Sequence, residues 1–199
     1  MRHSLLGRAA LVALTTFVLP TPSLAQNDLV ALDRVHELYV SGRSREAAMA
    51  LAGVSAAFRQ EIGRCKDPEI GAKLLDLEPR TDALVSRLGN GRVSNAQELT
   101  QEFVLFDRAL AENHLQLAEL GWSQRRNGRL DAVGRDLDLA VRYAERSVRW
   151  TQRTPDAGTR AALDAARGTA AQLIATPAQP PVDAERSLAA LATVVKGNP

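Results

Sequence analysis

Apolar residues return every three or four positions along most of this chain, a spacing that predicts amphipathic helices. The clearest stretch runs from Phe103 to Trp150, where two such segments meet at Asn127-Gly128. We expect a long helical hairpin here, with the other helices packed around it. No stretch beyond residue 25 alternates apolar and polar residues as a strand would. The pattern therefore predicts an all-α fold, a bundle of two helix hairpins with trailing helices.

Turn and cap residues divide the pattern into helices. Gly42 ends one helix and Gly89-Asn90-Gly91 another, because glycine adopts left-handed backbone conformations easily. Asp67-Pro68 and Thr154-Pro155 each read as a cap followed by proline in the first turn of a new helix.

Two further signals lie inside the pattern. Ser94 followed by Gln97 is typical of a capping box, so a helix is expected to open there. Pro79 falls within an otherwise helical stretch. Because an interior proline removes one hydrogen bond, we expect a kink or a break near Glu78.

The chain divides into three parts. Residues 26–175 form the predicted bundle, and residues 176–199 form a proline-rich linker with a short helix from Asp183 to Val195. Placing Gly42 over Gly128 brings Leu51 over Leu137 and the two cap-proline restarts to within one residue of register. An internal duplication explains this alignment, and so does a chance match between two similar hairpins.

The first 25 residues have the layout of a secretory signal peptide. Arg2 and Arg8 precede an apolar run from Ala9 to Leu19, and prolines and small residues lead to Ala25. The run is about half of the ~20 residues that a membrane span requires, so we expect cleavage after Ala25 and no span in the remaining chain. The predicted location is the periplasm or the exterior of the cell.

Removal of this segment changes the charge balance. The full chain has 25 basic and 23 acidic residues, and both excess charges are Arg2 and Arg8. The remaining chain is therefore formally neutral. Nucleic-acid binding loses its usual support, because it needs a surplus of cations. The single cysteine, Cys65, excludes a disulfide within the chain.

Part of the long hairpin resembles a tetratricopeptide unit. The residues that carry the likeness lie in positions where that family places packing residues: Leu120, Gly121, Gly128, Leu137 and Ala140. The match covers residues 117 to 144 and ends where the family closes its second helix with proline, because here the helix continues to Trp150. The resemblance implies packing of a helix pair and binding of a partner in a groove, and it transfers no binding residue.

Histidine supplies the candidate metal or cofactor ligands. His36 and His114 lie on the apolar faces of two predicted helices, and two facing imidazoles could hold a metal ion or a haem. The alternative for each is a histidine at the edge of the core, bonded to a carbonyl. The chain has no phosphate loop, no G-x-S-x-G elbow and no H-E-x-x-H motif. We therefore expect neither an enzyme nor a bound cofactor.

Arginine supplies the candidate interaction surface. Four arginines recur along one helix at steps of four, three and four, which places them on one face: Arg142, Arg146, Arg149 and Arg153. Such a face is either solvated and laced with ion pairs, or a docking surface for an acidic partner or an anionic membrane surface. Trp122 and Trp150 are the aromatic residues expected to contribute to an interface.

These observations favour a non-catalytic protein of the cell envelope that mediates protein–protein interaction or has a structural role. The alternative is a metal- or haem-binding helical bundle that uses His36 and His114. The first hypothesis implies an unidentified partner protein in the cell envelope, for which an acidic protein is one candidate.

Overall fold

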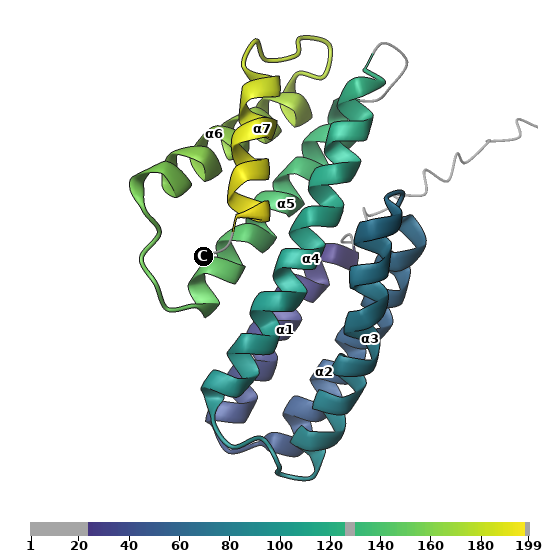
Figure 1. Cartoon of the computed structure of the whole chain (residues 1–199), viewed down its shortest axis with the longest axis vertical. Helices are drawn as coiled ribbons and strands as arrows, with labels where there is room; N and C mark the ends of the chain where they lie inside the picture. Colours follow the sequence, from purple (N-terminus) through teal and green to yellow (C-terminus); the bar gives the residue numbers. More distant parts are fainter. Residues whose placement is uncertain (1–23, 126–129, 198–199) are drawn as a thin grey trace, which may run out of the picture.

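The computed structural model describes residues 24–125 and 130–197 of the chain (Figure 1). Within these ranges every regular element is a helix, which confirms the predicted all-α class. The helices are, in chain order, α1 (Leu24–Val40), α2 (Ser44–Arg64), α3 (Pro68–Gly89), α4 (Ala96–Ser123), α5 (Leu130–Trp150), α6 (Ala157–Ala175) and α7 (Ala184–Lys196).

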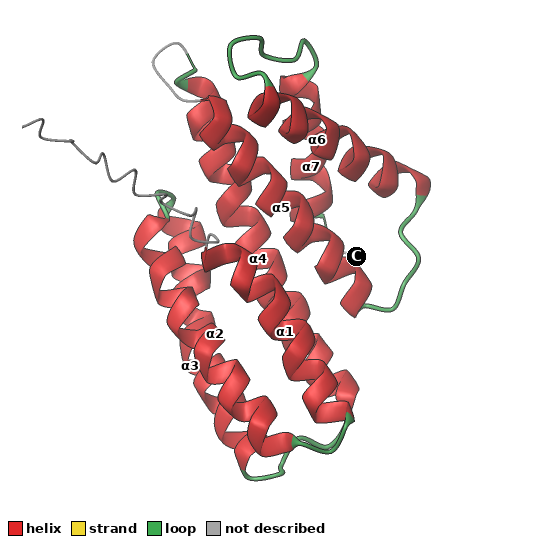
Figure 2. Ribbon diagram, turned by 180° about the vertical axis from the view of Figure 1, so that it is seen from behind, coloured by secondary structure: helices red, strands yellow, loops and turns green. Residues whose placement is uncertain are grey.

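The α4–α5 pair forms the spine of the molecule, as the hairpin prediction required. α4 is the longest helix at 28 residues, and α5 packs along it. α1, α2 and α3 cover one half of this pair, whereas α6 and α7 cover the other half (Figures 1 and 2). Consecutive helices are spatial neighbours almost throughout, as expected for short connections. Among the described residues, the α4–α5 pair therefore connects the half that contains α1–α3 to the half that contains α6 and α7.

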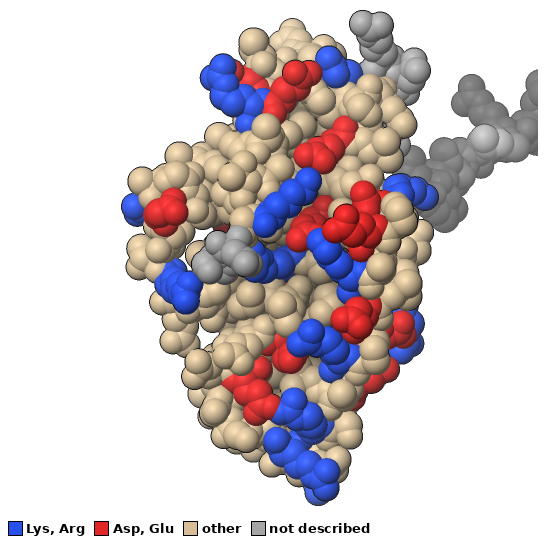
Figure 3. Space-filling view, viewed as in Figure 1, with Lys and Arg blue, Asp and Glu red and all other residues tan. Residues whose placement is uncertain are grey.

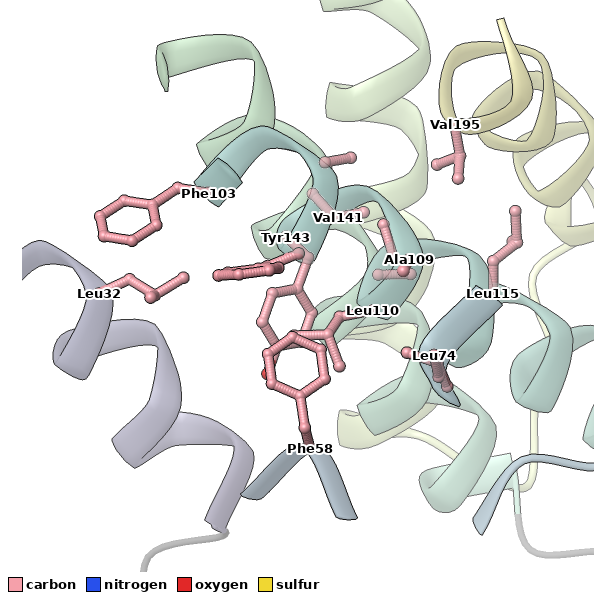
Figure 4. Packing of buried hydrophobic residues seen from close by; sticks show 14 of the residues in the cluster. Leu32, Phe58, Leu74, Phe103, Ala109, Leu110, Leu115, Val141, Tyr143 and Val195 are labelled. Atoms are coloured by element: carbon pink, nitrogen blue, oxygen red, sulfur yellow. The ribbon is translucent and has the colours of Figure 1, made fainter. Parts of the chain in front are cut away.

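Aromatic rings fill the centre of the half formed with α1–α3. Phe58 of α2 meets Phe106 of α4 edge to face, with ring centroids 5.3 Å apart, and Phe103 meets Trp150 in the same way at 5.3 Å. Figure 4 shows Phe58 pointing into the space beside Tyr143, with Leu110 next to both rings. These large side chains compensate for a core that is otherwise built from leucine, valine and alanine.

Two of the predicted helix boundaries are confirmed. Gly42 has a φ of +76°, and the N–H of Arg43 that follows donates to the carbonyl of Leu38, which closes α1 as a glycine-terminated helix does. The side chain of Asp67 accepts hydrogen bonds from the backbone N–H groups of Glu69 and Ile70, and so caps α3.

Two other predicted caps are shifted. α4 is capped by Asn95, whose side chain accepts from the N–H of Glu98, and not by Ser94. The Glu98 carboxylate reaches back to the N–H of Ser94 at 3.0 Å, so the cap bond of a capping box lies one residue later than expected, whereas its return bond goes to the residue before the cap. Likewise, Asp156 and not Thr154 caps α6, by accepting from the N–H of Thr159 at 2.7 Å.

The break predicted near Glu78 does not occur, because α3 continues through Pro79. Pro79 lies on the exposed face of the helix, as does Leu75, whose carbonyl loses its partner there. Water can satisfy this carbonyl on the outer face, so the helix tolerates the proline.

Three of the tetratricopeptide-like positions, Gly121, Leu137 and Ala140, lie within the packed part of the α4–α5 pair. A Cβ at Gly121 would lie only 2.8 Å from a methyl carbon of Val133, so glycine permits the close approach of α4 and α5. Leu137 and Ala140 are fully buried on the facing side of α5. Asn127-Gly128 itself lies outside the described residues, as do most of the predicted signal peptide and the last two residues of the chain.

The terminal helix α7 packs against α6 and α4 and contributes to the same hydrophobic cluster as the rest of the bundle. Its inward residues are Ala184, Leu188, Leu191 and Val195. Among the described helices, none combines the length and the apolarity that crossing a bilayer requires.

Candidate functional site

The four arginines that were predicted to share one helix face do not form one open face, because three of them lie on α5 and Arg153 lies beyond its end. Arg142 pairs with Asp138 one turn earlier at 2.7 Å, and Arg149 pairs with Asp33 of α1 at 2.6 Å. Arg153 is exposed beyond the end of the helix. Surface pairs of this kind contribute little to stability or attraction, so these residues present a mostly neutralised surface. Figure 3 shows the same interleaving of acidic and basic side chains over the face in view.

Arg146 does not lie on the solvated face where it was expected, because its side chain is buried, with 4% of its surface exposed. Its guanidinium makes a two-pronged ion pair with the fully buried Asp107 of α4, with one N–O distance of 2.8 Å. The indole N–H of Trp150 donates to the same carboxylate at 2.8 Å. Trp150 is thereby a core residue that holds α4 to α5, and not a surface anchor.

Helix geometry explains why Arg146 differs from its neighbours. At 100° per residue, it is the member of the series closest in angle to Tyr143 and Trp150, which face α4. Arg146 lies about 40° from Arg142 around the helix axis, and this difference is enough to place Arg146 in the core while Arg142 faces solvent. Hydrophobic periodicity does not resolve such an angle.

Arg146 and Trp150 stabilise the ionised carboxylate of Asp107, but burial removes its contact with water. Burial raises the pKa of Asp107 from 3.8 to about 6, against the opposing effects of Arg146 and Trp150. The Asp107 carboxyl is therefore ionised above about pH 6, and its burial costs desolvation free energy that the contact with Arg146 offsets in part.

His114 lies in a second polar cluster further along α4. It is fully buried; its Nδ1 lies 3.0 Å from a carboxylate oxygen of Asp136, and its ring stacks on Tyr143 with centroids 5.6 Å apart. Its Nε2 makes no hydrogen bond and lies 3.5 Å from a carboxylate oxygen of Glu61 on α2. The side-chain amide of Asn113 donates to that same oxygen at 3.1 Å.

This second cluster already contains a cation. Arg64 at the end of α2 donates to Glu61 at 2.9 Å and to Asp136 at 3.2 Å, so it bridges the two acids that flank His114. Within residues 24–125 and 130–197, no group of three or more His, Cys, Asp or Glu side chains is arranged to hold a metal ion.

The two candidate histidine ligands are not brought together. His36 packs against Trp150, with ring centroids 5.4 Å apart, whereas His114 stacks on Tyr143. Trp150 and Tyr143 are two turns apart on α5, which separates the levels of the two imidazoles by about 10 Å. The histidines therefore lie at different heights of the bundle, each against its own aromatic ring.

Trp122, the other expected interface residue, is largely buried at the far end of α4. Its indole N–H donates to Glu185 of α7 at 3.2 Å, and the guanidinium of Arg125 lies over its ring at 4.9 Å. Trp122 thus fastens α7 to the spine. Arg126 and Arg129, which follow near the predicted turn, lie outside the described residues.

A groove does exist beside the α4–α5 pair, where α6 and α7 complete its walls. It encloses a cavity of about 670 Å³, within the range typical of binding pockets. Small and aliphatic side chains from all four helices line it: Val104, Ala144, Val148, Ala162, Ala190 and Val194. Two charged residues, Arg108 and Asp156, stand among them.

The sequence pattern did not single out Asp107 or Arg108, and it implied a groove beside the hairpin without the residues that line it. Asp107 could have been noticed, because it interrupts the apolar face of α4 between Phe103 and Leu110, as His114 does. The lining of the groove could not have been predicted, since it depends on where α6 and α7 dock against the spine.

Comparison with known proteins gives no relative: no protein-family model, curated protein or solved structure matches this chain.

Proposed function

We propose that the protein is a non-catalytic helical protein of the periplasm or cell exterior that binds a partner protein by taking up an apolar segment in the α4–α7 groove. The observation that carries the proposal is the groove itself, an aliphatic cavity of about 670 Å³ that remains open to solvent in a folded single chain. Globular chains ordinarily fill space of this kind with their own side chains, so an open apolar cavity is a candidate site for another molecule.

The shape of the groove supports a protein segment as the occupant. Its walls consist of helix faces with small side chains, which allow another backbone to come close. Recognition of a helix or an extended segment in such a groove depends on a few apolar side chains inserted between helices.

The buried ion pair between Asp107 and Arg146 supports this role from behind the groove. Asp107 and Arg146 are the sequence neighbours of Arg108 and Ser147, which line the cavity. The ion pair between α4 and α5 therefore fixes two of the four walls relative to one another. A preformed groove of this kind pays less ordering entropy when a partner binds.

The test uses residues 26–199 as bait for an envelope extract of cells that produce the protein. An Ala190→Trp variant fills the groove, and Ala189→Trp, at an exposed neighbouring position outside the groove, is the matched control. We expect wild type and Ala189→Trp to retain the same partner and Ala190→Trp to lose it. Equal recovery by all three proteins, or no partner with any of them, would contradict the proposal.

A further inference from the structure

Arg108 is a charged residue of the groove for which no acid among residues 24–125 and 130–197 forms an ion pair. It is half-buried on α4, and one guanidinium nitrogen donates to the carbonyl of Gly197 at the end of α7. None of the ion pairs among the described residues involves Arg108. The acid one turn further along α4, Glu112, pairs instead with Lys73 of α3 at 2.8 Å.

The other charged residue of the groove does not neutralise Arg108. The carboxylate of Asp156 accepts the N–H of Thr159 at 2.7 Å as the cap of α6, and these backbone hydrogen bonds lower its pKa. Its charge is thus engaged with the N-terminus of that helix, which favours an anion. A guanidinium has five N–H donors, and the contact with Gly197 uses only part of this capacity.

The rest of the lining defines what can lie beside Arg108. None of the described residues that line the groove is aromatic, and the small polar groups among them are hydroxyls such as those of Ser147 and Thr193. Such a wall suits aliphatic side chains and offers no stacking platform. An ion pair in a partly dehydrated groove is also stronger than one on the open surface.

Resting on the proposed function, we infer that the segment bound in the groove is aliphatic and acidic, and that Arg108 receives its carboxylate. Arg108 is then the residue that determines specificity, because a bidentate guanidinium–carboxylate pair fixes both charge and orientation. The partner is recognised by a carboxylate placed within an apolar segment, and the overall charge of either protein is not decisive, since this chain is neutral after residue 25.

The experiment selects binders to residues 26–199 from a random dodecapeptide library and measures the affinity of the leading synthetic peptide by fluorescence anisotropy. We expect the selected peptides to share an Asp or Glu among aliphatic residues. Replacing that acid by its amide in the peptide should weaken binding to the wild-type protein at least tenfold. This arm needs no change in the protein and is therefore independent of folding.

The protein variants complete the test. Arg108→Gln should lose affinity to the same extent and become indifferent to the acid-to-amide change, whereas Arg153→Gln, an exposed arginine outside the groove, should bind as wild type does. Full affinity of Arg108→Gln, or of the amide peptide, would overturn the role of the carboxylate while leaving the groove as the site.

Two other results would overturn the proposed function itself as well as the role of Arg108. Binding that survives Ala190→Trp, or a library that yields no binder, would remove the groove and with it the proposed function. A gain of tenfold or more in peptide affinity after deletion of residues 198 and 199 would show that the end of this chain is the occupant, which excludes a partner segment as the natural one.

Discussion

Replacement of Arg146 by methionine tests the buried ion pair that joins α4 to α5. The change leaves the fully buried carboxylate of Asp107 without its cation and keeps the apolar bulk of the side chain. Two unit charges about 4 Å apart attract by roughly 4 kcal/mol at an effective dielectric constant of about 20. Breaking a buried pair by removing one partner costs about 3–5 kcal/mol, so we expect a loss of this size in the free energy of unfolding at pH 8.

The loss should depend on pH with a defined sign. The pKa of Asp107 is about 6 in the folded protein, above its ordinary value of 3.8, and Arg146 is one of the groups that hold it down. Without Arg146 this pKa rises further. A carboxyl whose pKa is raised on folding stabilises the folded state at low pH and loses this contribution as the pH rises through the folded-state value. The variant should therefore lose about 1.4 kcal/mol more at pH 8 than at pH 5 for each unit of additional shift.

Urea unfolding followed by circular dichroism at pH 5 and pH 8 measures both quantities, and an unchanged m-value shows that the comparison is valid. The second variant, Asp107→Asn with Arg146→Met, removes both charges and keeps an oxygen that can accept the N–H of Trp150. We expect this double variant to recover stability to within about 1 kcal/mol of wild type, because neutral replacements of buried pairs are well tolerated. A destabilisation of Arg146→Met that is equal at both pH values, or a double variant no more stable than the single one, would refute this reasoning.

Three further substitutions test the packing of the helices by the same unfolding assay. Gly134→Ala should destabilise by about 1–3 kcal/mol, because its Cβ would lie 2.9 Å from the backbone carbonyl of Ala170 across the α5–α6 contact; a neutral result would mean that the two helices are not this close. Gly168→Ala, on an open face of α6, should stabilise by about 0.5–1 kcal/mol and so provides the control, whereas a loss there would indicate an unseen contact. Pro79→Ala should stabilise by about 1–3 kcal/mol by restoring the hydrogen bond to the Leu75 carbonyl, and a loss would instead favour a break in α3.

The fold was predictable to the extent that single-helix signals determine it. Hydrophobic periodicity located the spine, and Gly42 and Asp67 marked helix ends because their chemistry acts within one turn of the backbone. The capping box was misplaced by one residue, since Ser94 and Asn95 are both good caps and only the side-chain geometry decides between them. Of the kink or break predicted near Glu78, the break is absent, because the cost of an interior proline depends on whether the free carbonyl faces water.

The candidate site was less predictable, because it depends on contacts between helices that are distant in sequence. Arg146 belonged to a regular series of arginines, and only the rotation of α5 against Asp107 shows that it is buried. Trp122 and Trp150 were expected at an interface, but their N–H groups are used inside the chain by Glu185 and Asp107. The groove requires all four of its helices in place, so no single segment carries its signature.

The most direct test of the central claim is site-specific photo-crosslinking in cells that produce the protein. A benzophenone amino acid is introduced at Thr193, an exposed residue that lines the groove, and in a second strain at Leu75, an exposed residue of α3 outside it. If the groove binds a partner protein, illumination should give a discrete crosslinked species with the probe at Thr193, which Ala190→Trp abolishes, and none with the probe at Leu75. A crosslink from Leu75 alone, or none from Thr193, would contradict the assignment of the groove as the binding site.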